Sequence, residues 1–250
     1  MSGNETVDSI CRGAVTLAQP RVGYRFNIDS VLLADFARQV APRPGGGLAV
    51  DLGAGCGVVG LLLARWWDSC RVLLVELQQE LARLAEANVV RNDLAGRVRV
   101  VQADLRRRDS WCREPARVVV SNPPFFKRGR GRVSSNPQVA LAKHEVTCCL
   151  AELVAAAAGA LARDGGLALV HASDRAEEID RALRDLGLSL RVRRGVIPLP
   201  SRPESRILLW ATREPGGVDE LPPLVVESSP GRYTEELAAI LGGRGLTGAR

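Results

Sequence analysis

The chain has 250 residues, of which 46% are hydrophobic and 25% are charged, and this ordinary globular composition suits one large α/β domain or two small ones. No apolar run reaches the roughly 18 residues of a membrane span, and the polar N-terminus lacks a signal-peptide core, so we expect a cytoplasmic protein. The net charge of +6 favours an anionic partner such as nucleic acid, but its almost exclusive origin in arginine is equally typical of codon bias.

Hydrophobic patterning predicts alternating strands and helices along most of the chain. Residues 1–22 fit an irregular segment or a β-hairpin, and the helical spacing over 28–40 has Asp29 placed as its cap. The alternation predicts a mostly parallel sheet with helices on both faces. Buried strands are expected at 48–52, 71–77, 98–104, 117–121 and 167–172, and helices at 58–67, 78–92, 147–163 and 174–187, with the third helix ending at Asp164-Gly165-Gly166.

The alternation stops after the last of these helices. Residues 190–199 and 206–213 resemble two strands without a helix between them, which is typical of an antiparallel pair at the far edge of the sheet. The tail, 221–241, fits a short strand, a turn and a last helix. We therefore predict a single Rossmann-like α/β domain with a seven-stranded, mostly parallel sheet and an antiparallel terminal hairpin. Its parts are an N-terminal segment (1–40), a core (48–213) and a C-terminal extension (218–250).

The cysteines show neither a C-x-x-C pair nor the spacing of a zinc site, so we expect no bound metal. In an intracellular α/β protein, free and mostly buried thiols are the usual state. The six are Cys11, Cys56, Cys70, Cys112, Cys148 and Cys149.

A glycine-rich turn follows the first buried strand, in VDLGAGCG (50–57). This strand, turn and helix allow a nucleotide-like cofactor to approach the backbone closely. The G-x-G-x-x-G match at 55–60 is weak evidence for NAD, because a carboxylate at Asp51 would repel a pyrophosphate. Asp51 suits a cofactor that presents an ammonium group, such as the methionine end of S-adenosylmethionine.

Two further acids end the next two strands. Glu76 can accept hydrogen bonds from both ribose hydroxyls of a nucleoside, a device shared by NAD and S-adenosylmethionine enzymes. Asp104, in QADL, can accept a hydrogen bond from an adenine amine. Three acids at the ends of three successive strands, beside a glycine turn, are much better explained by a cofactor site than by solvated strand ends.

The stretch RVVVSNPPFF (117–126) ends a buried strand on the polar side chain of Asn122. Methyl transfer to an exocyclic amine requires chiefly that the nitrogen lone pair point at the methyl carbon. If the Asn122 side-chain oxygen and the Pro123 carbonyl each accept one N–H, that lone pair becomes available. Pro124 helps to make the loop rigid, and Phe125 offers a face on which a flipped base can stack.

In this order, VDLGAGCG, VLLVEL, QADL and SNPPFF resemble the class I S-adenosylmethionine-dependent methyltransferases of the amino-methylating N-P-P-[FY] group, over residues 48–126. The flanks are similar to one family of that group, the bacterial tRNA1(Val) adenine-37 N(6)-methyltransferases. The similar stretches are QPRVGYRFNIDSVLLADFA (19–37), NPPFFKRG, ALAKHE (140–145), RPESRILL and LPPLVVESSPGRYTEELAAIL.

This resemblance implies a cofactor, S-adenosylmethionine, and a role for each matching residue. Asp51 with Gly53, Gly55 and Gly57 would hold its methionine end, Glu76 with Leu77 its ribose, and Asp104 with Leu105 its adenine, near Asn122. The GYRFNID stretch would close over the cofactor, with Phe26 and Asn27 as the candidates, although it also fits a helix lead-in with a buried phenylalanine.

A basic stretch, KRGRGR (127–132), directly follows the proposed catalytic loop. Lys127, Arg128, Arg130 and Arg132 are candidates for contacts to RNA phosphates, against the alternative of a solvated loop. The whole stretch between the N-P-P-F motif and His144 is short and arginine-rich rather than lysine-rich, unlike the family pattern, so contacts to the RNA do not carry over residue by residue. We expect His144 and Glu145 to be structural and His171 to be a packed strand residue.

The leading hypothesis is an adenine N(6)-methyltransferase acting on tRNA, at adenosine 37 of tRNA1(Val), and monomeric. Methylation of a protein glutamine is the main rival, because N-P-P-[FY] serves any planar amide or amine, and another RNA or DNA is a further one. An NAD-dependent oxidoreductase leaves Asp51 and SNPPFF unexplained. A non-catalytic RNA-binding module would tolerate loss of the three acids, yet all are present.

Overall fold

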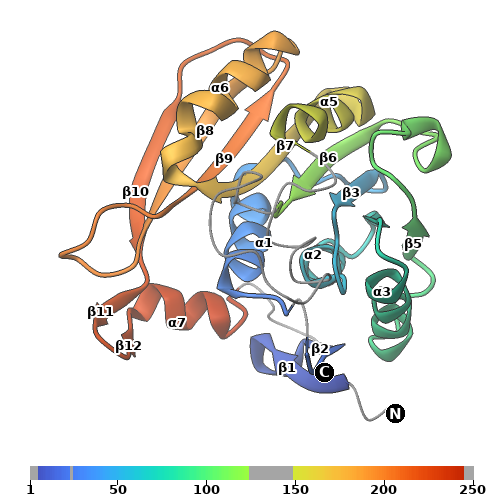
Figure 1. Cartoon of the computed structure of the whole chain (residues 1–250), viewed down its shortest axis with the longest axis horizontal. Helices are drawn as coiled ribbons and strands as arrows, with labels where there is room; N and C mark the ends of the chain where they lie inside the picture. The colour runs from blue at the N-terminus through green and yellow to red at the C-terminus, as the bar shows by residue number, and fades with distance from the viewer. Residues whose placement is uncertain (1–4, 23–24, 124–148, 245–250) are drawn as a thin grey trace.

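The computed structural model describes residues 5–22, 25–123 and 149–244, and an eight-stranded sheet forms its centre (Figure 1). The strands are β3 (Leu48–Leu52), β4 (Arg71–Glu76), β5 (Val98–Gln102), β6 (Ala116–Ser121), β7 (Leu161–Ala172), β8 (Ser189–Ile197), β9 (Arg206–Thr212) and β10 (Asp219–Val225). Their order is β10-β8-β9-β7-β6-β3-β4-β5. The strands from β5 to β7 pair in parallel, and β9 is antiparallel to both β7 and β8.

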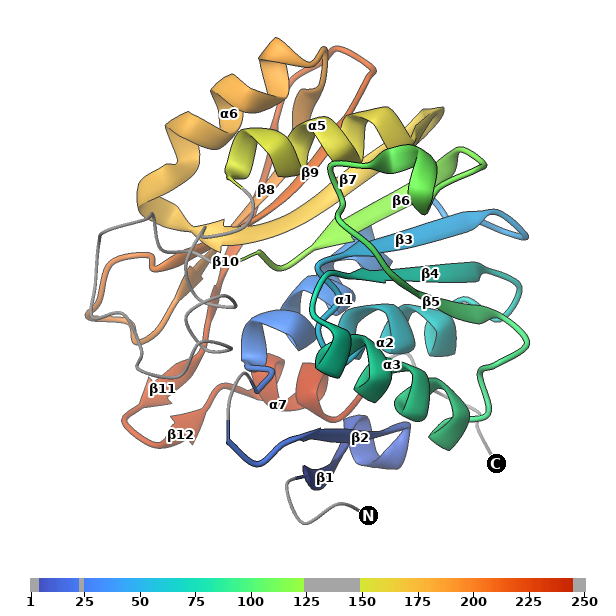
Figure 2. The same ribbon diagram turned by 45° about the vertical axis from the view of Figure 1, so that its right-hand side comes forward.

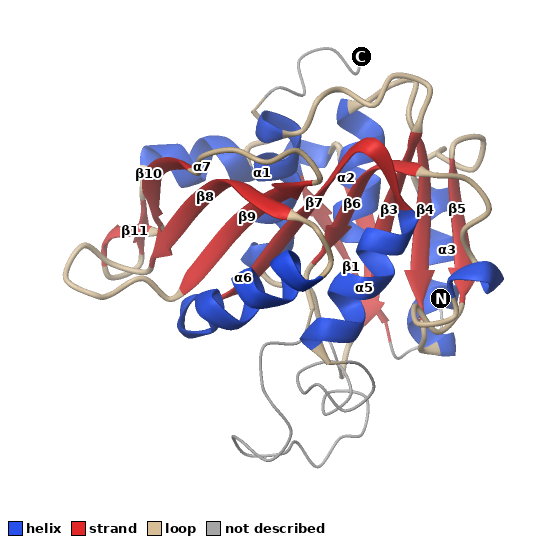
Figure 3. Cartoon of the chain, turned by 90° about the horizontal axis from the view of Figure 1, so that it is seen from above, coloured by secondary structure: helices blue, strands red, loops and turns tan. Residues whose placement is uncertain are grey.

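Helices cover both faces of this sheet (Figure 3). One face carries α1 (Ile28–Val40), α2 (Val58–Trp66), α3 (Gln79–Arg91) and α7 (Glu235–Leu241), and the other carries α5 (Leu150–Ala160) and α6 (Ala176–Asp185). Short 3-10 turns lie at η1 (Cys11–Gly13), η2 (Arg108–Ser110) and η3 (Ser173–Arg175). Two hairpins stand apart from the sheet, β1 (Glu5–Ile10) with β2 (Val15–Pro20), and β11 (Glu227–Ser229) with β12 (Arg232–Tyr233).

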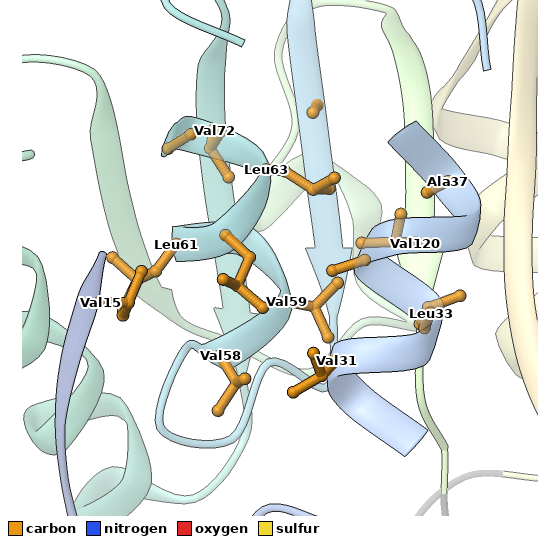
Figure 4. Close-up of a cluster of buried hydrophobic side chains, with 14 of the residues drawn as sticks. Val15, Val31, Leu33, Ala37, Val58, Val59, Leu61, Leu63, Val72 and Val120 are labelled. Atoms are coloured by element: carbon orange, nitrogen blue, oxygen red, sulfur yellow. The ribbon is translucent and has the colours of Figure 1, made fainter. Parts of the chain in front are cut away.

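The β-branched run of β6 shows why the sheet is buried on both sides. Val118 and Val120 join the core beneath α1 and α2, while Val119 points to the core beneath α5. Successive side chains of a strand alternate between faces, so a central parallel strand is apolar throughout. In Figure 4, Val120 faces Val31 and Leu33 of α1 within the first of these cores.

The predicted alternation and the antiparallel pair are confirmed, but the sheet has eight strands where seven were expected. The additional strand is β10, from the start of the C-terminal tail, which pairs in parallel with β8. The antiparallel pair therefore does not form the edge of the sheet. A short strand that contains Pro222 and Pro223 is suited to an edge, because proline cannot donate to a ladder.

The predicted end of the helix at Asp164-Gly165-Gly166 is wrong. Helix α5 ends at Ala160, and Leu161 begins the twelve-residue strand β7. The glycines serve close packing within the strand instead of a helix cap. A Cβ at Gly166 would lie 2.2 Å from the Trp210 ring, and one at Gly165 would lie 2.7 Å from the carbonyl oxygen of Ala116.

The N-terminal hairpin, one of the two forms expected for residues 1–22, is fastened to helix α3 by side-chain amides. Asn88 is fully buried; its Oδ1 accepts from the Ala18 amide at 2.7 Å, and its Nδ2 donates to the Ala18 carbonyl at 2.8 Å. The same Nδ2 donates to the Cys56 carbonyl at 2.9 Å, in the glycine turn. Asn92 pairs in the same way with Thr16, at 2.9 and 2.8 Å. These bonds connect the hairpin to the carboxyl ends of the strands.

No helix in the described ranges is long and apolar enough to cross a membrane.

Candidate functional site

The carboxyl ends of β3 and β6 lie near the start of α1 (Figure 2). A narrow pocket is lined by residues from these three places. Its volume is about 10 Å³, which is room for one group the size of a water molecule or an ammonium. The lining residues are Phe26, Ser30, Asp51, Gly53, Ala54, Cys56, Val58, Val59 and Asn122. Four predicted site residues, Phe26, Asp51, Gly53 and Asn122, are thus brought together.

Asp51 is the buried charge of this pocket, with 1% of its surface exposed. Its Oδ2 accepts a hydrogen bond from the Gly60 amide at 3.0 Å, in the first turn of α2. Burial raises the pKa of Asp51 to about 7, the Gly60 N–H opposes this rise, and the nearby Glu76 adds to it. A carboxylate in such a position gains strongly from a bound cation, because the cation replaces lost hydration.

The glycine turn between β3 and α2 depends on left-handed backbone at Gly53, Gly55 and Gly57, whose φ values are 71°, 58° and 93°. A Cβ at Gly57 would lie 3.0 Å from the Leu74 side chain, so that position is closed by packing. A Cβ at Gly53 would meet no described atom within 4 Å. The turn therefore leaves its backbone open at Gly53, where a ligand can lie against it.

Glu76 holds the glycine turn in place. Its Oε2 accepts from the Gly55 amide and its Oε1 from the Gln78 amide, both at 2.8 Å. Burial raises the pKa of Glu76 against the opposing effect of backbone N–H groups, first that of Gln78. The role of Glu76 in binding a ribose stays a prediction, and its free lone pairs allow both tasks. Leu77, directly after it, is 41% exposed and lies outside the narrow pocket.

Asp104 lies two residues beyond the end of β5, in a more open position. It is paired with Arg106, whose Nη2 lies 2.6 Å from Oδ2, and hydrogen bonds from Arg106 keep the pKa of Asp104 low. An adenine amine at this site would share the carboxylate with Arg106. The Leu105 carbonyl accepts from the Trp111 indole at 3.1 Å, which fixes the loop that carries both predicted adenine contacts.

Asn122 is fixed at the tip of β6 by a residue that the sequence analysis missed. Its Nδ2 donates to the hydroxyl of Ser30 at 3.0 Å, and Ser30 is itself buried in the first turn of α1. Next to it, the Ser121 hydroxyl donates to the Leu52 carbonyl at 2.7 Å and ties β6 to β3. Among the described residues no group donates to Asn122 Oδ1, so that oxygen is available as an acceptor.

The available signal for Ser30 was its position on the helix. It lies three, four and seven residues before Leu33, Ala34 and Ala37, on the apolar face of α1. A hydroxyl on such a face needs a partner, but the sequence alone does not indicate that the partner is 92 residues away.

The start of α1 corrects one prediction. Asn27, not Asp29, caps the helix: its side chain accepts from the Asp29 amide at 3.1 Å. Asp29 lies in the first turn, buried, with its Oδ2 3.4 Å from Nε of Arg206. Both residues have cap-forming side chains, and the extended backbone at Asn27 decides between them. Asn27 does not line the narrow pocket, whereas Phe26 does.

Of the remaining predicted residues, His171 and Pro123 lie in the described part of the chain, and the others lie outside it. His171 is fully buried on β7, as expected, and burial lowers its pKa to about 4. Pro123 follows Asn122, partly buried. In the described part of the chain, no group of three or more His, Cys, Asp or Glu side chains could hold a metal ion. Outside the described residues lie Pro124, Phe125, Lys127, Arg128, Arg130, Arg132, His144 and Glu145.

Comparison with known proteins identifies a family for this chain. A family model described as the methyltransferase small domain matches residues 29–186. A tRNA1(Val) (adenine(37)-N6)-methyltransferase of Klebsiella pneumoniae subsp. pneumoniae is 31% identical over 194 residues, 77% of each chain. One of Erwinia tasmaniensis is 30% identical over 202 residues, 80% of each chain.

Among solved structures, a predicted O-methyltransferase from Agrobacterium tumefaciens is similar with a TM-score of 0.66 at 23% identity, covering 86% of this chain and 96% of that one. The tRNA m1G37 methyltransferase of M. jannaschii has a TM-score of 0.57 at 12% identity, covering 85% of this chain and 55% of that one. At these identities the structures show a shared fold only.

Proposed function

This chain belongs to the methyltransferase small domain family and, within it, to the tRNA1(Val) (adenine(37)-N6)-methyltransferases, and we propose that it methylates the exocyclic N6 amine of adenosine 37 in tRNA1(Val). The observation that carries this proposal is the shared pocket of Asp51 and Asn122. It combines a buried carboxylate for a cationic cofactor with an oriented amide for a planar amine.

The residues present fit S-adenosylmethionine, which the family implies as the cofactor. The narrow pocket has room for an ammonium beside the buried Asp51, and Gly53 leaves open space in front of its backbone. Glu76 and Asp104 follow along the same sheet edge, on β4 and just beyond β5, at increasing distance from the pocket. We propose that they hold the ribose and the adenine, with Leu77 and Leu105 against the nucleoside.

S-adenosylmethionine would supply an electrophilic methyl group, so the protein need only bind and orient the acceptor amine. Asn122 Oδ1 accepts one N–H of that amine and the Pro123 carbonyl accepts the other. The nitrogen lone pair is then less conjugated with the adenine ring and can point at the methyl carbon. Ser30 keeps the Asn122 amide from turning, because its hydroxyl accepts from Nδ2. After transfer, the surplus proton on nitrogen leaves to water without a dedicated base.

The segments around the pocket have roles that follow from their positions. We propose that residues 1–40 close over the cofactor through Phe26, that 48–213 form the catalytic core, and that 218–250 complete the substrate side of the one domain. Pro124 and Phe125 would complete the base site, and Lys127, Arg128, Arg130 and Arg132 would meet RNA phosphates. We further propose a monomer that works in the cytoplasm.

A methyl-transfer assay tests this function. Labelled S-adenosylmethionine is offered with unmodified tRNA, ribosomal RNA, DNA or cellular protein, and the labelled product is digested. We expect N(6)-methyladenosine in tRNA1(Val), at position 37. Label only in protein would point to glutamine methylation, and label only in DNA or in another RNA would move the substrate. Any of these results would overturn the proposal.

A further inference from the structure

A second, larger pocket flanks the first. Its volume is about 350 Å³, and its lining comes from the end of β1, η1, the start of α1, β12 and the end of α7. We call it the flanking pocket; its walls include Ile10, Arg12, Phe26, Ile28, Tyr233 and Leu241. Phe26 lines the flanking pocket on one side and the narrow pocket on the other, so the two are neighbours.

The chemistry of these walls is specific. The half-buried part of the lining is apolar, through Ile10, Phe26, Ile28 and Leu241, and the exposed part, the rim, carries one aromatic ring and one cation. The ring is that of Tyr233, which is 52% exposed on the short strand β12. The cation is Arg12, which is exposed and has no acidic partner within the described ranges. The described lining contains no acidic residue.

The backbone at the rim holds Arg12 in an unusual conformation. Cys11 and Arg12 have φ values of 51° and 54°, in a region that residues other than glycine rarely adopt. Such a conformation persists only where the surroundings enforce it, and here Cys11 is buried in the core while Arg12 points outward. A Cβ on Gly242 would lie 3.3 Å from Arg12 Nε. The Arg12 side chain therefore lies close to Gly242, the residue that directly follows α7.

The position relative to the sheet places this pocket on the substrate side. Strand β10 is parallel to β8, and β8, like β7, is antiparallel to β9, so the carboxyl ends of β10 and of the catalytic strands share one edge. The hairpin β11–β12 directly follows β10 at this edge, and Arg232 beside Tyr233 is exposed.

We propose that the flanking pocket binds an unpaired nucleobase of the substrate RNA, a neighbour of the adenine that is methylated. The base stacks on Tyr233, and Arg12 meets the adjoining phosphate. Aromatic stacking tolerates any base, whereas an acid-free rim with a cation selects a polyanion. This inference rests on the proposed function, because it assigns the second site to the same RNA.

The experiment measures methyl transfer to an unmodified tRNA1(Val) transcript at several salt concentrations, together with calorimetric binding of S-adenosylmethionine. The variants are Tyr233→Ala, Tyr233→Phe and Arg12→Ala. Arg181→Ala is the matched control, because Arg181 is exposed and has no ion pair among the described residues, but lies on α6 over the other face of the sheet. Thermal melting checks that each variant is folded.

We expect Tyr233→Ala to raise the KM for tRNA about 10-fold while kcat and the Kd of S-adenosylmethionine stay within twofold. Tyr233→Phe should keep the wild-type KM, Arg12→Ala should lower the salt slope by about one, and Arg181→Ala should change neither. A folded Tyr233→Ala enzyme with unchanged KM overturns the flanking pocket alone. A wild-type enzyme that binds the cofactor but leaves tRNA unmethylated overturns the proposed function, and this inference with it.

Discussion

The cofactor side and the substrate side of the pocket are built differently. On the cofactor side, the bonds that shape the site join residues close in sequence: Asp51 to Gly60, and Glu76 to Gly55, which is 21 positions away. On the substrate side, the spans are 92 positions from Asn122 to Ser30 and 177 from Arg206 to Asp29. The first side is a local supersecondary motif, whereas the second exists only when distant segments have docked.

The sharpest separation of the two sides comes from Asn122→Ala. This change removes the acceptor for the substrate amine but leaves Asp51, Glu76 and the glycine turn in place. We expect kcat for tRNA methylation to fall about 100- to 1000-fold, the effect of losing one preorganised polar group. The Kd of S-adenosylmethionine, measured by calorimetry, should stay within a factor of about two. Undiminished turnover would remove Asn122 from the mechanism.

Asp51→Asn tests the cofactor side with the opposite pattern. The amide keeps an oxygen for the Gly60 N–H but loses the charge that meets an ammonium. We expect the Kd of S-adenosylmethionine to rise about 100-fold. Because a buried carboxylate destabilises the cofactor-free fold, the free energy of unfolding at pH 8 should rise by about 1–2 kcal/mol, seen as a higher Tm. A variant that bound the cofactor normally would contradict the role of Asp51.

The pH dependence of the wild-type protein sharpens the same point. Burial raises the pKa of Asp51 to about 7 from an ordinary value of 3.8, so the empty folded site holds a proton that the unfolded chain releases. The stabilisation of the folded state by this bound proton is fully present below about pH 4 and is lost as the pH rises to about 7. Cofactor affinity should change in the other direction, since an ammonium requires the ionised carboxylate.

As the pH rises toward 7, we therefore expect the Kd of S-adenosylmethionine to fall by up to about tenfold per pH unit. Above pH 7 the Kd should level off. Calorimetry between pH 5.5 and 8.5 measures this, and Asp51→Asn should give a nearly flat profile. A wild-type profile as flat as that of the variant would show that Asp51 does not titrate in this range.

The smallest expected effect is that of Ser30→Ala, which loosens the Asn122 amide without removing it. A single neutral hydrogen bond is typically worth about 0.5–1.5 kcal/mol, so kcat should fall about 3- to 10-fold. The Kd of the cofactor and the Tm should change little. Ser30→Thr keeps the hydroxyl and should restore most of kcat. An alanine variant with full activity would show that Asn122 needs no such support.

The same contrast explains what the sequence predicts and what it does not. The glycine turn, the strand-end acids and the asparagine at the tip of β6 form continuous motifs, and their spacing alone brings them to one edge of a parallel sheet. The same alternation predicts that the sheet is mostly parallel, whereas the order of its strands was not predicted. Ser30 was missed because its partner is specified by the docking of α1 against β6 and not by any local pattern.

The errors have a related cause. Gly165 and Gly166 were interpreted as a helix stop, a local rule, while their actual cause is the approach of the Trp210 ring from a strand that comes later in the chain. Strand β10 was expected only as an isolated short strand, since its pairing with β8 is not encoded in its own proline-containing segment. The cap at Asn27 was assigned to Asp29, and both residues satisfy the local preference.

The side-chain amide of Asn88 links the Ala18 backbone of the N-terminal hairpin to the glycine turn, so exchange of the Ala18 N–H should depend on the state of that turn. Its Oδ1 protects the Ala18 N–H, and its Nδ2 spans the Ala18 and Cys56 carbonyls, so one buried side chain joins the N-terminal hairpin to the glycine turn. When a ligand rigidifies the turn, the hairpin loses the fluctuations that let solvent deuterium reach that amide. We therefore expect hydrogen–deuterium exchange at the Ala18 amide to slow when the neighbouring site is occupied.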